Sequence, residues 1–97
     1  MSLKYDIQLS KGAVRDLKKM EPALRDFIYG RIYEIGQDPY KNEKLSGSYK
    51  DLRSQHSRYK GVEYRAIYYI NEEGKLVIIA LVGTRENIYK ELARRLF

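Results

Sequence analysis

The feature that most constrains how this chain can fold is a pair of apolar segments joined by a short polar turn. Residues 62–70 are rich in Tyr, Ile and Val, side chains that favour the pleated surface of a β-strand. The following Asn-Glu-Glu-Gly, residues 71–74, has the length and composition of a hairpin turn. Residues 76–82 are apolar without interruption, which indicates a central strand covered on both faces. The sequence therefore predicts a β-hairpin around which the rest of the chain is organised.

The segments before this hairpin have the patterns of one strand and two helices. In residues 3–9 every second side chain is apolar, as in a half-buried strand. Apolar residues then recur at helical spacing in residues 13–20 and again in residues 24–35. Ser10 is suited to cap the first of these helices, and Pro22 to begin the second. We expect the two helices to form a hairpin that covers one face of the sheet.

The remaining segments complete an α+β pattern. Residues 42–48 are polar and predict a loop, residues 49–55 predict a weak strand with one polar face, and residues 56–61 predict a basic bend. From residue 88 to 96 apolar side chains return at helical spacing and predict a C-terminal helix. The predicted fold is an N-terminal strand and a helical hairpin packed on an antiparallel sheet of about four strands, with a C-terminal helix and with the helices on one face.

The composition limits both the architecture and the chemistry. Ninety-seven residues are enough for one domain only, so we expect a single domain over residues 1–97. The net charge of +6 favours a nucleic acid, a ribosome or an acidic protein as partner, although a soluble domain with excess Lys would carry the same charge. With no Cys, one His and no glycine-rich nucleotide loop, we expect no metal and no cofactor. No signal-peptide core and no membrane-spanning stretch is present, which predicts a cytoplasmic protein.

Positively charged side chains are expected to meet at one end of the hairpin. Because its strands are antiparallel and the turn lies at residues 71–74, residues 83–85 return beside residues 60–62. Arg65 lies farther along the first strand, and a slip of one residue in the register would turn it to the other face. The group so predicted contains Arg85, Lys60 and Arg58, with His56 as a further candidate.

Such a group of cations suits the binding and cleavage of a phosphodiester. A guanidinium binds phosphate in a bidentate way and keeps its proton, and two of them can stabilise the charge of a pentacovalent transition state. RNA carries its own nucleophile, the 2′-hydroxyl, so a protein that deprotonates it and protonates the leaving oxygen needs no metal. Tyr89 offers an aromatic face for stacking of a base. His56, which titrates nearest neutrality, is the natural base if a side chain has that role.

Each of these side chains also has a purely structural interpretation. Arg65 can pair with Glu63, two residues away on the same face of the strand, and Arg85 can pair with Glu86. Tyr89 is one of ten tyrosines and can serve to pack the last helix. The residues of the basic bend can form an ordinary solvated surface. The residue pattern alone leaves these alternatives open.

Four segments are informative when they are taken together. They read A-V-R-D-L-K-K-M at 13–20, K-L-S-G at 44–47, Y-R-A-I-Y-Y-I at 64–70 and L-V-G-T-R-E-N-I-Y at 81–89. In this order and at this spacing they resemble the RelE/ParE superfamily of bacterial toxins from type II toxin–antitoxin systems, over nearly the whole chain. The Gly-x-Arg of the last segment, with a Tyr four residues after the Arg, is most similar to the RelE branch.

The resemblance implies a fold and a function. The implied fold is a compact α+β domain with a helical hairpin and an antiparallel sheet, in agreement with the residue pattern. The implied function is that of an mRNA interferase, a ribosome-dependent endoribonuclease that cleaves mRNA in the decoding site by attack of the 2′-hydroxyl and so inhibits translation. A cognate antitoxin wraps around such toxins and holds them inactive. The implied partners are therefore the antitoxin, in a toxin–antitoxin hetero-oligomer, together with the ribosome and mRNA.

The resemblance also implies roles for single residues. Arg65 looks like the family's strand arginine at the scissile phosphate, Arg85 like its second catalytic arginine, and Tyr89 like its C-terminal tyrosine near the reacting nucleotide. Which residue is the general base stays open. The residues implied to contact the RNA are His56, Arg58 and Lys60.

Two features depart from the family's pattern. Glu63 places an acid close to a site for phosphate, and residues 84–88 contain no His, although some ribosome-dependent branches have one near the C-terminal Tyr. A ParE-like toxin, which inhibits DNA gyrase and cuts no RNA, shares the fold and is the alternative function. A third interpretation is an inactive basic domain that only binds RNA or an antitoxin.

Overall fold

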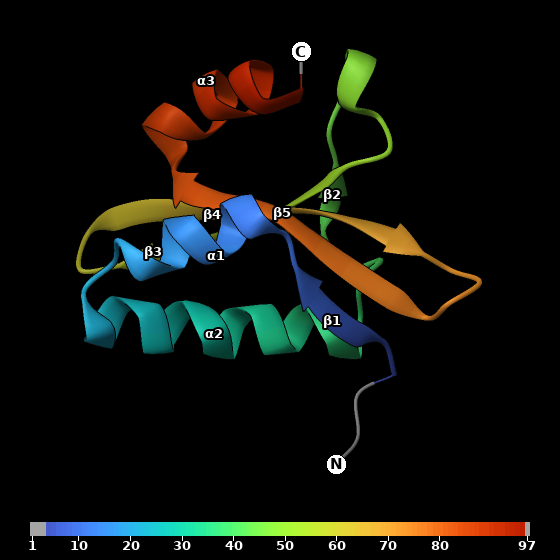
Figure 1. Cartoon of the computed structure of the whole chain (residues 1–97), viewed down its shortest axis with the longest axis horizontal. Helices are drawn as coiled ribbons and strands as arrows, with labels where there is room; N and C mark the ends of the chain where they lie inside the picture. Colours follow the sequence, from blue (N-terminus) through green and yellow to red (C-terminus); the bar gives the residue numbers. More distant parts are fainter. Residues whose placement is uncertain (1–3, 97) are drawn as a thin grey trace.

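The computed structural model describes residues 4–96 as a five-stranded sheet with helices on both of its faces (Figure 1). The elements are β1 (Asp6–Leu9), α1 (Lys11–Lys18), α2 (Pro22–Gln37), β2 (Glu43–Lys44), the 3-10 turn η1 (Gly47–Tyr49), β3 (Arg53–Tyr59), β4 (Val62–Asn71), β5 (Leu76–Thr84) and α3 (Arg85–Leu96). The strands lie in the order β1-β5-β4-β3-β2, with β1 parallel to β5 and the other neighbouring pairs antiparallel. None of the described helices has the length and apolar character needed to cross a membrane.

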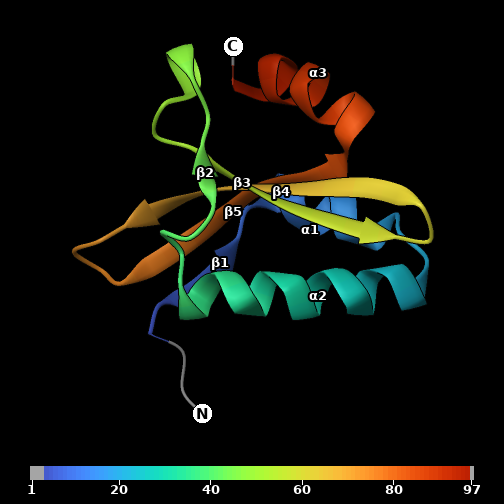
Figure 2. The same cartoon turned by 180° about the vertical axis from the view of Figure 1, so that it is seen from behind.

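The helices are divided between the two faces of the sheet, as Figures 1 and 2 show from opposite sides. On one face, apolar residues of α1 and α2 form a core with β1, β4 and β5. On the other face, Ile88 and Leu92 of α3 pack on Ile67 of β4 and Leu81 of β5. The α+β prediction is confirmed, whereas the expectation of helices on one face only is wrong. The uninterrupted apolar segment 76–82 fits this arrangement, because helices bury β5 from both faces.

The start of the chain follows the predicted order closely. The strand predicted for residues 3–9 is β1, which begins at Asp6, while residues 1–3 lie outside the described part. The cap prediction is confirmed, since Ser10 Oγ accepts a hydrogen bond of 3.0 Å from the backbone N–H of Ala13. Pro22 is the first residue of α2, also as predicted.

The sheet differs from the prediction at β3. It begins and ends later than the weak strand predicted at 49–55, so His56 and Arg58 belong to a strand and not to a bend. The strand was placed too early because its inward side chains are polar and find partners on α2. Gln55 Nε2 donates to the backbone oxygen of Arg31 at 2.7 Å, and Ser57 Oγ accepts from Arg31 Nε at 2.9 Å. The sheet has five strands rather than about four, because the short β2 pairs with the start of β3.

An extra residue in β5 sets the register of the central hairpin. Ile67 of β4 lies opposite Leu81, but the next residue, Tyr68, lies opposite Ile79, so Ala80 is a β-bulge. Ile79 faces the core of α1 and α2, whereas Leu81, two residues later, faces α3. The bulge therefore reverses the alternation of side chains along β5 and lets one apolar strand serve both cores.

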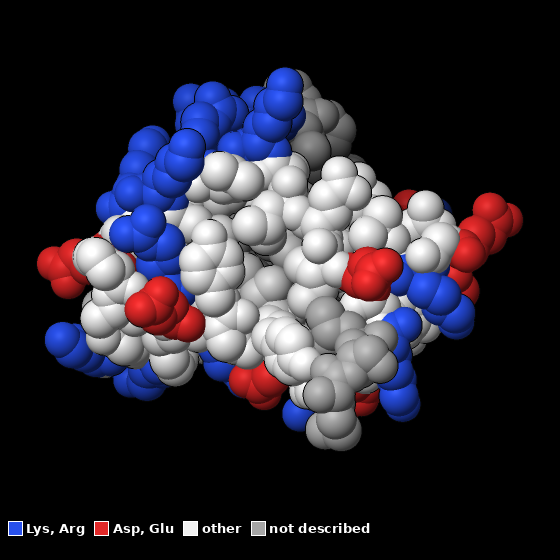
Figure 3. Space-filling view, turned by 60° about the horizontal axis from the view of Figure 1, so that its bottom comes forward, with Lys and Arg blue, Asp and Glu red and all other residues white. Residues whose placement is uncertain are grey.

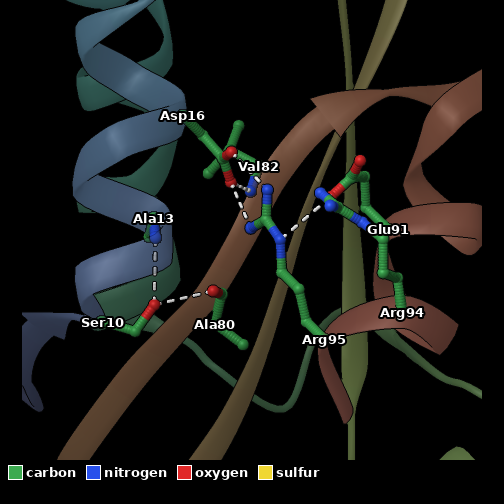
Figure 4. A network of polar contacts seen from close by, with 8 residues as sticks. All are labelled: Ser10, Ala13, Asp16, Ala80, Val82, Glu91, Arg94 and Arg95. Atoms are coloured by element: carbon green, nitrogen blue, oxygen red, sulfur yellow. Dashed lines mark hydrogen bonds and ion pairs between the residues drawn. The ribbon is translucent and has the colours of Figure 1, made fainter. Parts of the chain in front are cut away.

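Side chains of α1 hold the edge of β5 beyond the end of β1 (Figure 4). β1 pairs with β5 only as far as Ile79, so no described strand lies beside the edge that follows. Ser10 Oγ donates to the backbone oxygen of Ala80 at 2.7 Å, and Asp16 Oδ2 accepts from the N–H of Val82 at 2.9 Å. These two contacts attach Ser10 and α1 to the part of the β5 edge that no described strand pairs.

Asp16 also connects α1 to α3 across this edge (Figure 4). Its two carboxylate oxygens accept from Arg95, at 2.7 Å from Nη2 and 2.9 Å from Nη1. The side chains of Asp16 and Arg95 are 10% and 26% exposed, and Arg95 Nε also lies 3.1 Å from Glu91. The hydrogen bond to Asp16 is the main reason why the pKa of Arg95 is raised above its usual value. This bidentate pair, in which the Asp16 carboxylate is nearly buried, fixes the last turn of α3.

Asp16→Ala is expected to lower the free energy of unfolding by about 2–3 kcal/mol, because Arg95 and the Val82 N–H would lose their acceptor. Chemical denaturation followed by circular dichroism measures the loss. Asp26→Ala makes the same change of charge at an exposed position of α2 and should cost less than about 0.5 kcal/mol. Equal losses for the two variants would show that the contacts of Asp16 contribute nothing.

Glu72 holds the turn between β4 and β5 at the opposite end of the sheet. Its carboxylate accepts from Tyr5 OH at 2.8 Å, from Tyr40 OH at 2.6 Å and from Lys75 Nζ. These hydrogen bonds, with that of Lys75 the strongest, lower the pKa of Glu72 to about 2. The bond to the same carboxylate raises the pKa of Tyr40 to about 12. The contacts join the hairpin turn to the start of β1 and to the segment after α2.

Glu72→Gln is expected to remove part of the acid sensitivity of the fold. The pKa of Glu72 is about 2 in the folded protein against an ordinary value of 4.5, so its contribution to stability is complete above the ordinary value. That contribution is lost as the pH falls toward the folded-state pKa. Thermal unfolding midpoints of wild type and variant should therefore differ near neutral pH and converge at acid pH. Glu73→Gln, in the same turn, should follow wild type, and a difference independent of pH would contradict the assignment.

Candidate functional site

The register of β3 and β4 brings most candidate residues to the face of the sheet that carries α3. Arg65 of β4 lies opposite His56 of β3, and Arg58 lies opposite Glu63. Directly opposite residues of antiparallel strands point to the same face, and Ile67, two residues after Arg65, packs under α3. The register that the sequence left undecided therefore places Arg65 on the α3 face.

The first turn of α3 adds the other two catalytic candidates. α3 starts at Arg85 directly after β5, and Tyr89 follows one turn later. Arg65 Nη1 donates to Tyr89 OH at 2.6 Å, and Arg65 Cζ lies 5.5 Å from the centre of the Tyr89 ring. Tyr89 is 44% exposed, so its ring also presents a free aromatic surface. The positive end of the α3 dipole adds to the positive potential of this corner.

The guanidinium of Arg65 is nearly buried and incompletely paired. Its side chain is 13% exposed. Nη1 and Nη2 donate to Tyr89 and Glu63, but Nε is buried and has no hydrogen-bond partner among the described residues. Buried donors are nearly always bonded in folded proteins, so an unpaired one needs an explanation. Arg65 is thus a cation held in place by Tyr89 and Glu63, and its Nε–H donates to no described residue.

Glu63 joins the two arginines. Its Oε2 lies 3.2 Å from Arg65 Nη2 and 3.6 Å from Arg85 Nε. The side chain of Arg85 is 66% exposed, so this second contact is loose. The pairing of Arg65 with Glu63 anticipated from sequence is present, whereas Arg85 pairs with Glu63 rather than with the neighbouring Glu86. Both guanidinium groups therefore converge on one anionic oxygen.

A depression of about 480 Å³ opens beside this pair. Arg58, Glu63 and Arg85 line it together, so the structure brings Arg58 and Arg85 to one place as the sequence predicted. Lys60 is not among its lining residues. It occupies the tight turn after β3 with a φ of 49°, and its Nζ lies 5.5 Å from the centre of the Tyr59 ring. Lys60 instead lines a separate groove between α1 and α3.

His56 lies beside Arg65 on the opposite side from this depression. Its backbone oxygen accepts from Arg31 Nη2 at 3.0 Å, which holds the strand against α2. Its exposed side chain lines a smaller hollow with Ser54 and with residues near β2. His56 is therefore adjacent to the arginines but stands outside the hollow that Arg58 and Arg85 share.

This arrangement is suited to bind an anion and to stabilise additional negative charge that develops on that anion during a reaction. Arg65 supplies an oriented guanidinium, Arg85 an exposed one, and Tyr89 a hydroxyl together with an aromatic surface. Two guanidiniums at one point suit the oxygens of a phosphodiester. Among residues 4–96 no group of His, Asp and Glu side chains has an arrangement that could hold a metal ion.

A larger groove lies on the other side of α3, between that helix, α1 and the end of β5. Its volume is about 700 Å³. Apolar side chains such as Leu24, Tyr64 and Val82 line it, together with five basic residues and three acidic ones. On the face of the molecule drawn in Figure 3, Lys and Arg side chains gather along one edge, while acidic side chains are scattered. The basic residues that line this groove are Lys19, Lys60, Lys90, Arg94 and Arg95.

Sequence reasoning did not find this groove. The exposed basic residues of α1 and α3 were visible as charged helix surfaces, but nothing in the pattern indicates that the two helices flank one cavity. The contact between Asp16 and Arg95 that brings the helices together joins residues far apart in the chain.

Comparison with known protein families gives a match over most of the chain. A family model of ParE-like toxins of type II bacterial toxin–antitoxin systems matches residues 7–93. This range includes all six candidate residues of the site. Among curated protein sequences, none matches the chain significantly.

Solved structures of RelE toxins have the same fold. A variant of the Escherichia coli toxin RelE in the free state has a TM-score of 0.74 at 24% identity, covering 96% of this chain and 98% of that chain. The toxin–antitoxin complex RelBE2 from Mycobacterium tuberculosis gives 0.73 at 23% identity, covering 88% and 95%. An archaeal RelE–RelB complex from Pyrococcus horikoshii gives 0.62 at 24% identity, covering 86% and 97%. At these identities the similarity shows the fold alone, which is that of RelE.

Proposed function

The chain belongs to the ParE-like toxins of type II bacterial toxin–antitoxin systems, and we propose that it is a ribosome-dependent endoribonuclease that cleaves mRNA. The observation that carries the proposal is the convergence of Arg65 and Arg85 on one anionic oxygen, with Tyr89 bonded to Arg65. The solved structures with this fold include RelE toxins, and the Gly-x-Arg with a Tyr four residues after the Arg is most similar to the RelE branch. We further propose that residues 1–97 act as one domain and that the protein works in the cytoplasm, where ribosomes translate mRNA.

The proposed reaction uses the RNA's own hydroxyl. The 2′-oxygen attacks the adjacent phosphorus, the bond from phosphorus to the 5′-oxygen breaks, and a 2′,3′-cyclic phosphate forms. A base takes the proton of the 2′-hydroxyl, and the leaving 5′-oxygen gains a proton. Arg65 and Arg85 offset the negative charge that grows on the phosphate oxygens, and the exposed ring of Tyr89 supports a neighbouring base. Arg58 and Lys60 contact flanking phosphates, and His56 is the candidate for proton transfer.

Arg65→Ala and Arg85→Ala are each expected to reduce mRNA cleavage by at least about 100-fold, because each removes a cation that stabilises the transition state. Primer extension on ribosomes programmed with a defined mRNA measures the rate. Lys18→Ala removes the same charge from an exposed position of α1 and should leave the rate within about twofold. Undiminished cleavage by either arginine variant would exclude that residue from the reaction.

The alternative is a ParE-like toxin that inhibits DNA gyrase. The matching family model is named for ParE-like toxins, which is the reason to test this function. The shared fold does not decide between an endoribonuclease and a gyrase inhibitor. Inhibition of gyrase supercoiling by the wild-type chain, with no cleavage of ribosome-bound mRNA, would establish the alternative.

We also propose a cognate antitoxin as partner. Several of the structural neighbours are complexes of a RelE toxin with its antitoxin or with an antitoxin peptide. In this chain the groove beside α3 combines an apolar lining with basic residues around it, which suits a segment that carries apolar and acidic side chains. The apolar face predicted for the last helix continues to Leu96 and Phe97, whose side chains lie outside the described part.

Lys90→Glu is expected to weaken binding of the protein encoded by the neighbouring gene by about 3- to 10-fold, mainly through slower association, because charges at the rim of an interface steer the encounter. Surface plasmon resonance at two salt concentrations measures both rates. Lys4→Glu makes the same reversal at an exposed residue before β1, outside the groove. Equal effects of the two reversals would mean that net charge, and not the groove, determines association.

A further inference from the structure

The carboxylate at the centre of the site has the wrong sign for a phosphate site. We propose that Glu63 is an internal competitor of the substrate: in the free protein it occupies the position between Arg65 and Arg85 that an RNA phosphate takes on binding. The inference rests on the proposed function, since it assumes that these arginines bind a phosphodiester. It makes Glu63 a residue that determines how selectively the site accepts RNA.

The contacts of Glu63 place one oxygen where a phosphate oxygen is needed. Oε2 is 3.2 Å from Arg65 Nη2 and 3.6 Å from Arg85 Nε, so a single anionic oxygen is shared by the two cations. A non-bridging phosphate oxygen that interacts with both guanidiniums must lie in the same region, because Tyr89 and the strand fix the Arg65 side chain. Both anions cannot occupy it at once.

The carboxylate satisfies the arginines only in part. Arg65 Nε is buried and has no partner among the described residues, and the contact with Arg85 is longer than a hydrogen bond. A phosphodiester offers two non-bridging oxygens and can engage an arginine in a bidentate way. The exchange of Glu63 for phosphate therefore replaces an incomplete set of contacts by a fuller one.

The surroundings allow Glu63 to leave. Its side chain is 27% exposed and lines the depression of about 480 Å³ together with Arg58. Arg58 lies directly opposite Glu63 on β3 and is exposed. The displaced carboxylate can thus turn toward solvent and toward a second cation without entering the core.

The expected consequence is weak binding of free RNA. Each RNA strand must displace Glu63, so contacts with the arginines alone give little affinity, and productive binding depends on contacts made elsewhere. Loss of the carboxylate at residue 63 should therefore tighten the binding of any single-stranded RNA.

The test compares Glu63→Gln with Glu86→Gln. Glu86 lines the same depression from the first turn of α3, and its removal changes the net charge equally. The probe is a fluorescent RNA oligonucleotide with 2′-O-methyl riboses, which cannot be cleaved. We expect Glu63→Gln to lower the Kd for this RNA by about 3- to 10-fold, because it removes a partly exposed charge that competes with phosphate. Glu86→Gln should lower the Kd by less than about twofold.

Two further variants keep the outcome interpretable. Glu63→Ala removes both the charge and the hydrogen-bonding group and should tighten binding as Glu63→Gln does, while thermal unfolding verifies that both variants are folded. In an Arg85→Gln background the gain should shrink, because one of the two cations is gone. Unchanged or weaker binding by both Glu63 variants, or a gain equal to that of Glu86→Gln, would overturn the proposal. Failure of wild type to cleave ribosome-bound mRNA would instead overturn the proposed function, because the binding test requires no cleavage.

Discussion

The bulge at Ala80 is the constraint on which the rest of the structure depends. It reverses the alternation of side chains in β5, so that Ile79 faces α1 and α2 and Leu81 faces α3. With Leu81 and Ile67 on the same face, α3 has an apolar surface on which to pack. The same register places Arg65 under the first turn of that helix, beside Tyr89. The geometry of the site is therefore a consequence of how two apolar strands pair.

The site brings cations together at an electrostatic cost that the fold must offset. Arg65 is only 13% exposed, and a desolvated guanidinium is costly unless an anion is close. Glu63 supplies that anion for Arg65 and, more loosely, for Arg85. Under the proposed function the residue that lets the arginines converge in the free protein is also the one that opposes the substrate. A conflict between stability and binding is expected where a site has to be assembled before its ligand arrives.

Local signals made most of the fold predictable from sequence, and long-range contacts made the rest unpredictable. The order of the elements other than β2 and η1, the starts of α1 and α2, and the central hairpin depend on neighbouring residues, and they were predicted correctly. β3 was placed too early because polar residues such as Ser57 point inward, and only the fold reveals that Arg31 satisfies them. The family resemblance identified Arg65 and Arg85, and their roles stay predictions. The pairing of Glu63 with Arg65 was anticipated, but its second contact with Arg85 was not, since sequence spacing favoured the acid next to Arg85.

α3 links the site to the groove on its other side. Its first two turns carry Arg85 and Tyr89, and its last turn holds Arg95, which is bound to Asp16 of α1. A helix of 12 residues is about 18 Å long and moves largely as one body, so a shift at one end is transmitted to the other. Any partner that moves α3 from the groove must therefore also move Tyr89 away from Arg65. By the reciprocity of coupled binding, RNA that fixes Tyr89 and Arg85 would oppose such a partner. Under the proposed function, an inhibitor bound in the groove would then act on Arg65, Arg85 and Tyr89 through α3 rather than by direct contact with them.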